Sequence, residues 1–140
     1  MIKKLTVKEV EYIAHSLAKN LMDWDEPIPH FSTRFANKLE SCIETPFTTF
    51  DKKSLYRGLN QKAAILFYLL IKNHPFQNGN KRIAVTTLLV FLMKNKKWLK
   101  VGTQEFYNFA VWVAQSPPTL KKDTVKAIAS FIRQNIEDFN

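Results

Sequence analysis

Cysteine and glycine are scarce in this sequence of 140 residues, which contains one cysteine, Cys42, and three glycines. One cysteine cannot form an internal disulfide or a cysteine-based zinc site, so a disulfide-stapled miniprotein is excluded and a reducing, cytoplasmic setting is expected. Hydrophobic residues make up 46% of the chain and aromatic residues 13%. This content excludes a disordered or collagen-like chain and predicts one folded domain over residues 1–140.

A membrane-spanning run and an export signal are also missing. The two longest apolar runs, at residues 63–71 and 83–93, are shorter than the ~18 residues that a membrane-spanning helix needs. The basic start, residues 1–5, resembles that of a signal peptide, but Lys8 and Glu9 follow where an apolar region would stand. We therefore expect no membrane partner.

Negative charge is absent from the middle of the chain. The sequence has 21 Lys and Arg against 12 Asp and Glu, a net charge of +9, and residues 52–104 contain no acid. The cations of this segment are Lys52, Lys53, Arg57, Lys62, Lys72, Lys81, Arg82, Lys94, Lys96, Lys97 and Lys100. Such a segment predicts an anionic ligand, with a solvated basic face as the alternative.

Hydrophobic periodicity predicts an all-α domain, a compact bundle of about six helices. Thr6 and Glu9 have the spacing of a capping box, which would open an amphipathic helix that runs to about residue 21. A later helix is apolar nearly all round between residues 63 and 71, which indicates a central, buried position. After the first helix, the predicted helices cover residues 32–42, 54–73, 79–94, 103–115 and 122–138.

One short segment departs from the helical pattern. Pro46 interrupts the chain after the second helix, and residues 47–50 read Phe-Thr-Thr-Phe. Aromatic and β-branched side chains favour extended backbone. We therefore expect a short extended flap here, for which a β-hairpin is one form.

The chemistry-bearing segment is the nonapeptide His-Pro-Phe-Gln-Asn-Gly-Asn-Lys-Arg at residues 74–82, between two strongly apolar helices. Gly79 permits a close backbone approach, and the N–H groups at the start of the following helix form an anion site. Lys81 and Arg82 fall in that first turn, where cations are unfavourable unless an anion is nearby. The segment therefore predicts a bound phosphate, with His74 as the proton acceptor.

The nonapeptide resembles the signature of the Fic/Doc family, His-Pro-Phe-x-(Asp/Glu)-Gly-Asn-(Gly/Lys)-Arg. The segment Asn37–Ser41, then Pro46 and Phe47, and the long helix into His74 resemble the family's flap region and core. The likeness covers about residues 30–100. It implies a Fic/Doc-type helical fold and the transfer of a group from a nucleoside triphosphate, ATP with Mg²⁺, to a hydroxyl of another protein.

The resemblance also implies a role for each matching residue. His74 would be the general base, Phe76 would anchor the loop in the core, and Arg82 would neutralise phosphate charge in the transition state. The nucleotide phosphates would be bound by Asn78, Gly79, Asn80, Lys81 and Arg82. The target segment would pair with the flap along Phe47, Thr48, Thr49 and Phe50.

Position 81 distinguishes two branches of the family. Fic enzymes that transfer a nucleotide usually have glycine there, whereas the Doc (death-on-curing) branch of toxin–antitoxin toxins has lysine, as this chain does. Lys81 therefore favours a Doc-like toxin kinase that phosphorylates a Ser or Thr of a host protein, with a translation GTPase as the implied target. The alternatives are a protein AMP transferase and a catalytically weak member that binds a nucleotide or a partner. Nucleic-acid binding has only the net charge in its favour.

Asn78 stands where the family places the acidic residue that holds Mg²⁺. A hard cation prefers charged oxygen ligands, and an asparagine offers one neutral oxygen. We therefore expect a weakened metal site and reduced activity.

Regulation is expected from a separate antitoxin. Self-inhibited Fic proteins carry the pattern (Ser/Thr)-x-x-x-Glu-(Gly/Asn), and no glutamate of this sequence has Ser or Thr four positions before it. The antitoxin would cover the basic cleft with a partly acidic segment that folds on binding.

Overall fold

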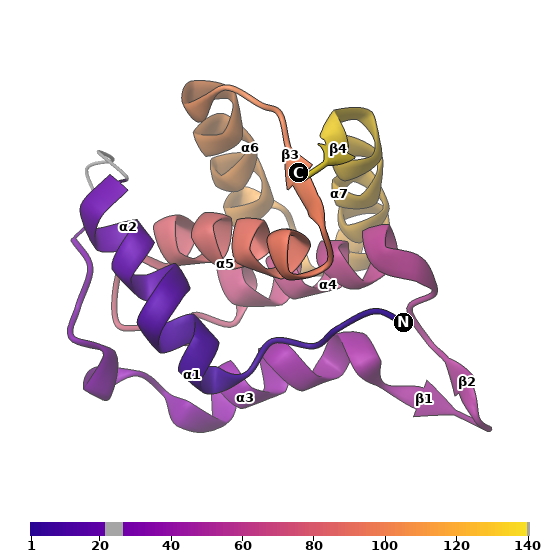
Figure 1. Ribbon diagram of the computed structural model, residues 1–140, viewed down its shortest axis with the longest axis horizontal. Coiled ribbons are helices and arrows are strands. Elements are labelled where there is room, and N and C mark those ends of the chain that lie inside the picture. Colours follow the sequence, from indigo (N-terminus) through magenta and orange to yellow (C-terminus); the bar gives the residue numbers. More distant parts are fainter. Residues whose placement is uncertain (22–26, 140) are drawn as a thin grey trace.

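The computed structural model describes residues 1–21 and 27–139. Over these residues the chain forms six helices, the first being an unbroken run of α1 (Val7–Glu9), the π-helical segment η1 (Val10–His15) and α2 (Ser16–Leu21) (Figure 1). The others are α3 (Ala36–Glu44), α4 (Gly58–Lys72), α5 (Asn80–Lys94), α6 (Thr103–Gln115) and α7 (Lys121–Asn135). The predicted helical fold is confirmed, and none of the described helices is long and apolar enough to cross a membrane.

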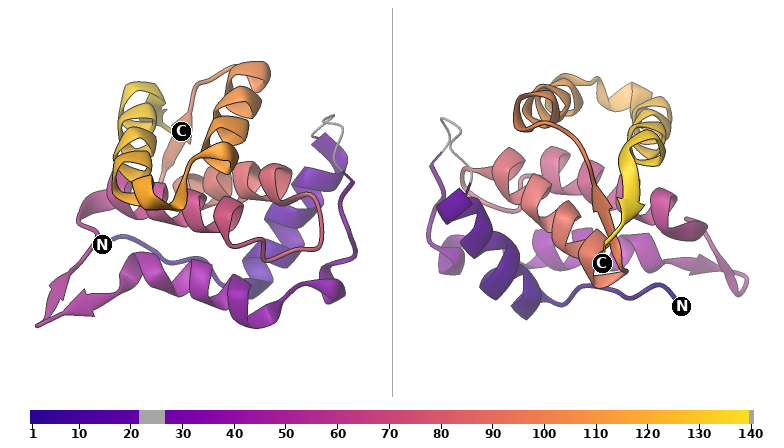
Figure 2. Two further views of the ribbon diagram at one scale, coloured as in Figure 1. Left: turned by 180° about the vertical axis from the view of Figure 1, so that it is seen from behind. Right: turned by 45° about the horizontal axis from the view of Figure 1, so that its top comes forward.

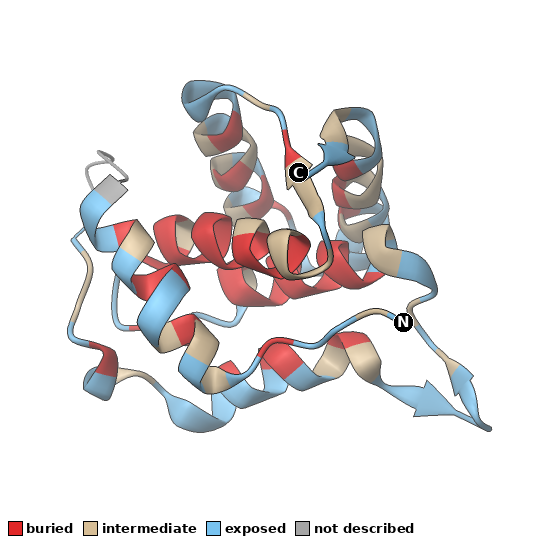
Figure 3. Cartoon of the chain, in the orientation of Figure 1, coloured by how far each residue is buried: buried red, intermediate tan, exposed pale blue. Residues whose placement is uncertain are grey.

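Helices α4 and α5 form the centre of the fold. Every residue of α4 from Lys62 to Ile71 is buried, and α5 is buried over most of its length (Figure 3). Helices α6 and α7 lie on one side of this pair, while α1, α2 and α3 lie on the other (Figures 1 and 2). A helix covered on all sides loses its one-sided apolar pattern, so the prediction of a central helix over residues 63–71 is confirmed.

The capping box at the start of the first helix is also confirmed. The Thr6 Oγ1 atom accepts a hydrogen bond from the Glu9 amide at 3.1 Å, and the Glu9 carboxylate accepts one from the Thr6 amide at 2.9 Å. Two otherwise unpaired amides are satisfied in this way.

The second helix begins later than residue 32, where the sequence pattern predicts it. A 3₁₀ turn, η2 (Phe31–Thr33), comes first, and α3 starts at Ala36. Phe35 stays extended between them because its amide donates to the Pro75 carbonyl at 2.8 Å. A contact with a segment forty residues away therefore sets the start of this helix.

The expected flap is a β-hairpin. After the 3₁₀ turn η3 (Thr45–Phe47), strand β1 (Thr49–Phe50) pairs antiparallel with β2 (Lys53–Ser54). Both turn residues, Asp51 and Lys52, have positive φ, as two-residue hairpin turns require. Because Ser54 is used in the hairpin, α4 begins at Gly58 and not at residue 54 as predicted.

The last helix ends earlier than predicted. Helix α7 stops at Asn135, and Ile136–Asp138 form strand β4, which pairs antiparallel with β3 (Lys97–Leu99). The apolar spacing that suggested a helix through residue 138 places Ile136 opposite the buried Leu99 instead. Pairing with β3 supplies the main-chain hydrogen bonds that a further helical turn would otherwise have supplied.

Candidate active site

The signature loop links the two central helices. Asn73 caps the end of α4, and Gly79 is the N-cap of α5. His74 follows directly after the cap of α4, is exposed, and has a backbone φ of +48°. Pro75, by contrast, is buried, and its carbonyl holds the Phe35 amide. The loop is therefore fixed to α3 on one side while His74 faces solvent.

Phe76 and Asn80 hold the loop in shape. The Phe76 ring is 2% exposed and lies near Phe31 and His15, with ring centroids 5.8 and 6.1 Å away. The Asn80 amide makes two hydrogen bonds to the Phe76 backbone, accepting from its N–H at 3.0 Å and donating to its carbonyl at 2.9 Å. The Asn80 side chain is thus used within the loop.

Gly79 lies against the segment that leads into η2. Its φ is +73°, and a Cβ built there would lie 2.7 Å from Ile28 Cδ1 and 2.8 Å from the Pro27 carbonyl oxygen. Its amide N–H donates to Asn78 Oδ1 at 2.8 Å. Backbone conformation and close packing both require a glycine here.

Arg82 is buried in a contact with the first helix. Arg82 is 7% exposed, and its guanidinium donates to the Ala18 carbonyl. One turn later on α5, Thr86 Oγ1 donates to the Ala14 carbonyl at 2.8 Å. Two polar side chains, four residues apart, therefore bind two carbonyls that are also four residues apart.

The loop brings a base and an anion site into one segment. His74 and Asn78 are exposed, and Lys81 is half-buried in the first turn of α5. The first N–H groups of any α-helix lack partners within the helix, and here they follow directly after the loop. The arrangement can accept a proton at His74 and hold an anion a few residues away.

A family model for the Fic/DOC family matches residues 4–92. The match includes the first helix, the hairpin, α4, the whole signature loop and most of α5. The chain belongs to the Fic/DOC family. No curated protein and no solved structure matches it. Membership supports a Fic-type transferase that acts on proteins, in a family whose members generally use a nucleoside triphosphate with a metal ion and are often paired with an antitoxin.

The hairpin of this Fic domain lies far from the loop. Helix α4 has 15 residues and is about 22 Å long, and the hairpin precedes it while His74 follows it (Figure 1). Only Thr49 and Phe50 of the four predicted flap residues are in a strand, and Phe50 is 75% exposed. Thr48 follows η3, while Phe47 lies in it and packs against Phe91. A target paired with β1 would need about seven extended residues to reach His74.

The Fic loop does not fit a magnesium ion held by protein carboxylates. Asn78 has a neutral amide oxygen that already accepts the Gly79 amide. Among the described residues, no three His, Cys, Asp or Glu side chains lie close enough together to hold a metal. Burial raises the pKa of the Cys42 thiol to about 12, so this residue cannot act as a thiolate ligand.

Little in the sequence marks His15 as a support of the loop. Its ring is packed edge-on against Phe31, lies near Phe76, and shares a hydrogen bond of 2.9 Å with the Pro29 carbonyl. Burial lowers the pKa of His15 from its ordinary value, so the neutral ring is the form that the fold favours. Its place next to Ala14 on the apolar face of the first helix is the one sequence signal of this burial.

Replacing Gly79 by alanine should destabilise the fold more than the same change at Gly58. Both glycines have positive φ, +73° and +77°, so both alanines share a backbone cost of roughly 1–2 kcal/mol. A Cβ at Gly58 meets no atom within 4 Å, whereas one at Gly79 overlaps Ile28 and Pro27. Urea unfolding should show an additional loss of about 1–3 kcal/mol for Gly79→Ala. Equal losses would contradict the close approach.

Stability should fall on acidification because of His15. Its pKa is lowered in the folded state, so the unfolded chain binds the proton more readily once the pH falls below the ordinary value of 6.5. The stabilisation is therefore complete above that pH and is lost as the pH falls below it. His15→Gln, which can still donate to Pro29, should flatten this dependence in urea unfolding at several pH values. His74→Gln changes an exposed histidine of the loop and should leave the dependence intact; an unchanged profile in His15→Gln would refute the assignment.

Proposed function

We propose that this protein is a Doc-like toxin kinase that transfers the γ-phosphate of ATP to a Ser or Thr hydroxyl of a host protein. The observation that carries the proposal is Lys81 at the second position of α5, at the end of the Fic signature loop. An ammonium there adds bulk and charge beside the phosphate-binding turn, where nucleotide-transferring relatives usually have glycine.

His74 acts as the general base in this proposal. It is exposed, and no described residue makes a hydrogen bond to its ring, so the ring can accept the proton of an incoming hydroxyl. The hydroxyl oxygen forms a bond to the γ-phosphorus while the bond from that phosphorus to the β–γ bridging oxygen breaks. The proton passes to His74, and the diphosphate nucleotide leaves.

The start of α5 holds the phosphates. Its first N–H groups point along the helix axis toward the loop, and Lys81 and Arg82 add positive charge in the same turn. Arg82 can touch a phosphate only if its guanidinium exchanges the Ala18 carbonyl for the nucleotide. In either arrangement its charge lies in the turn that receives the γ-phosphate, where it favours the developing negative charge.

The proposed partners follow from the Doc branch. The target is a cytoplasmic host protein, with a translation GTPase as the leading candidate, and a separate antitoxin controls the toxin. A target segment that docks on the hairpin must be long enough to extend along α4 to His74. An accessible, extended Ser- or Thr-containing loop is therefore the kind of acceptor that this geometry favours.

Label should reach the target from γ-labelled ATP and not from α-labelled ATP. Controlled expression followed by mass spectrometry identifies the modified host protein, which then serves as the acceptor. His74→Ala should abolish labelling, because the hydroxyl loses its proton acceptor, with a fall of about 10²-fold or more in rate. Lys81→Gly should weaken γ-transfer, since the charge that aligns the triphosphate is lost. Label from the α position in the unmutated protein would favour the AMP transferase, and no label from either would favour a binding-only member.

Asn78→Asp should strengthen the use of magnesium. A carboxylate can still accept the Gly79 amide and also offers a charged oxygen to a hard cation. Isothermal titration calorimetry should show that Mg²⁺ tightens ATP binding more in this variant than in the unmutated protein, and the transfer rate should rise. Gln77→Glu places the same charge at the neighbouring exposed position and should do neither. An unchanged magnesium dependence in Asn78→Asp would contradict the assigned metal position.

A further inference from the structure

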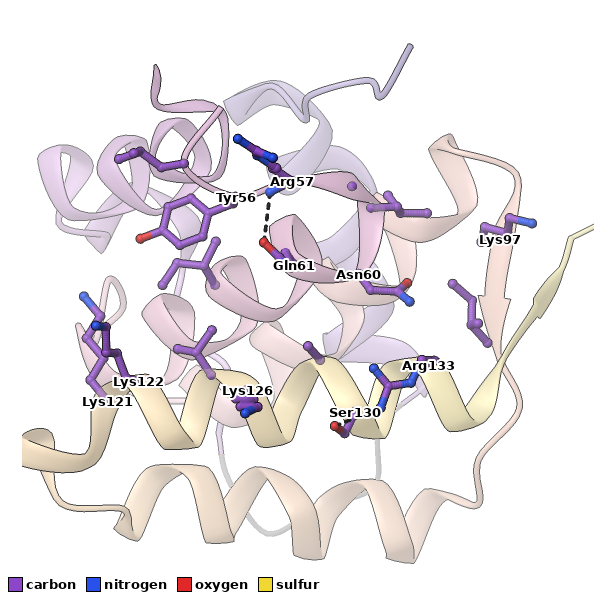
Figure 4. A pocket seen from close by; sticks show the side chains of 17 residues that line it. Tyr56, Arg57, Asn60, Gln61, Lys97, Lys121, Lys122, Lys126, Ser130 and Arg133 are labelled. Atoms are coloured by element: carbon purple, nitrogen blue, oxygen red, sulfur yellow. Dashed lines mark hydrogen bonds between the residues drawn. The ribbon is translucent and has the colours of Figure 1, made fainter. Parts of the chain in front are cut away.

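A basic groove lies at the end of α4 opposite the signature loop. It is a hollow of about 1060 Å³ between the segment that enters α4 and the length of α7 (Figure 4). Residues 55–61 form one bank, α7 forms the other, and Lys97 of β3 and Ile136 of β4 close one end. No residue of the loop at positions 73–79 lines it, so it is separate from the candidate active site.

Positive charge dominates the rim of this groove. None of its lining residues is an Asp or a Glu. Among the described residues, Lys97 alone of the six lining cations has a carboxylate partner, Asp138. The cations are Arg57, Lys97, Lys121, Lys122, Lys126 and Arg133. Because the rim attracts anions from both banks, the ligand that fits it carries several negative charges.

Three of these cations form a row along α7. Lys122, Lys126 and Arg133 are four and seven residues apart, so they share one face of the helix, and all three are exposed (Figure 4). The row is about 16 Å long at the rise of an α-helix. An extended anionic surface, longer than a single phosphate group, matches this length.

The floor of the groove is aliphatic. Leu59 and Ile65 of α4 face Val125 and Ala129 of α7 across it, and Tyr56 is the one aromatic residue that lines it. Single-stranded nucleic acids rely on several aromatic rings on which their bases stack. An aliphatic floor under a cationic rim suits instead a peptide with apolar side chains on one face and carboxylates beside them.

We propose that this groove binds an acidic amphipathic helix of a partner protein. The apolar face of the helix covers the floor between α4 and α7, and its acidic flank lies along Lys122, Lys126 and Arg133. A helix of about 11 residues spans the row. Its occupant would leave His74 uncovered, because no residue of the loop lines the groove, so binding here is independent of the transfer reaction.

The test is fluorescence anisotropy with two labelled synthetic peptides of about 15 residues and identical composition. In one, leucines recur at helical spacing with glutamates beside them; in the other, the order is shuffled so that no apolar face forms. The first should bind and the second should not. K126E with R133E should weaken binding by about tenfold or more, because attraction becomes repulsion at two positions. K8E with K19E makes the same change in net charge on exposed residues of the first helix and should leave binding intact.

Other outcomes would overturn the proposal. Equal binding of both peptides would show a nonspecific charge effect, and no binding of either would remove the amphipathic helix as occupant. A single-stranded oligonucleotide that binds more tightly and is released by K126E with R133E would assign the groove to nucleic acid. Self-association lost in the same variant, followed by sedimentation, would assign it to a second copy. H74A should bind the peptide normally, so a failed kinase assay and a failed docking assay remain distinguishable.

Discussion

The two hydrogen bonds between the Asn80 side chain and the Phe76 backbone determine the shape of the signature loop. They close the five residues from Phe76 to Asn80 into a ring at the point where the loop enters α5. Phe76 is thereby held in the core, Gly79 is held against Ile28, and His74 is left on the outside. An asparagine is suited to this because its amide can donate and accept at once. The outward position of His74 thus depends on a buried amide.

The same helix that presents the anion site is also bound to the rest of the fold through polar groups. Arg82 and Thr86 bind carbonyls of the first helix, where the π-helical segment meets α2. Such segments are common at functional sites because they interrupt regular helical pairing. The guanidinium that the proposed function assigns to the phosphates is therefore the same one that packs α5 on the first helix.

Local patterns predicted most of the fold and the identity of the loop. The capping box and the buried run of α4 depend on residues near one another in sequence, and each is where the pattern indicated. The hairpin is also local, although only Thr49 and Phe50 of the predicted extended residues 47–50 are in a strand. Two departures depend on distant partners. Phe35 is kept extended by Pro75, and Ile136 pairs with Leu99. Arg82 is buried because Ala18 is nearby in space, and no spacing in the sequence reveals that contact.

The acid-free segment, residues 52–104, also shows why net charge does not indicate how many cations are available to bind a ligand. Several of its lysines bind the protein itself. Lys62 donates to Ser54 and Tyr56, and Lys72 donates to the carbonyls of Ala114 and Ser116. Lys94 pairs with Glu9 and Lys97 with Asp138. Carbonyls at helix ends and turns carry partial negative charge, so a lysine there stabilises the chain without any acid. Lys81 and Arg82 lie in the first turn of α5, whereas Arg57 and Lys97 line the groove. The charge pattern suggested a single basic cleft, but no residue at positions 73–82 lines the groove, so the acid-free segment supplies cations to two separate parts of the fold.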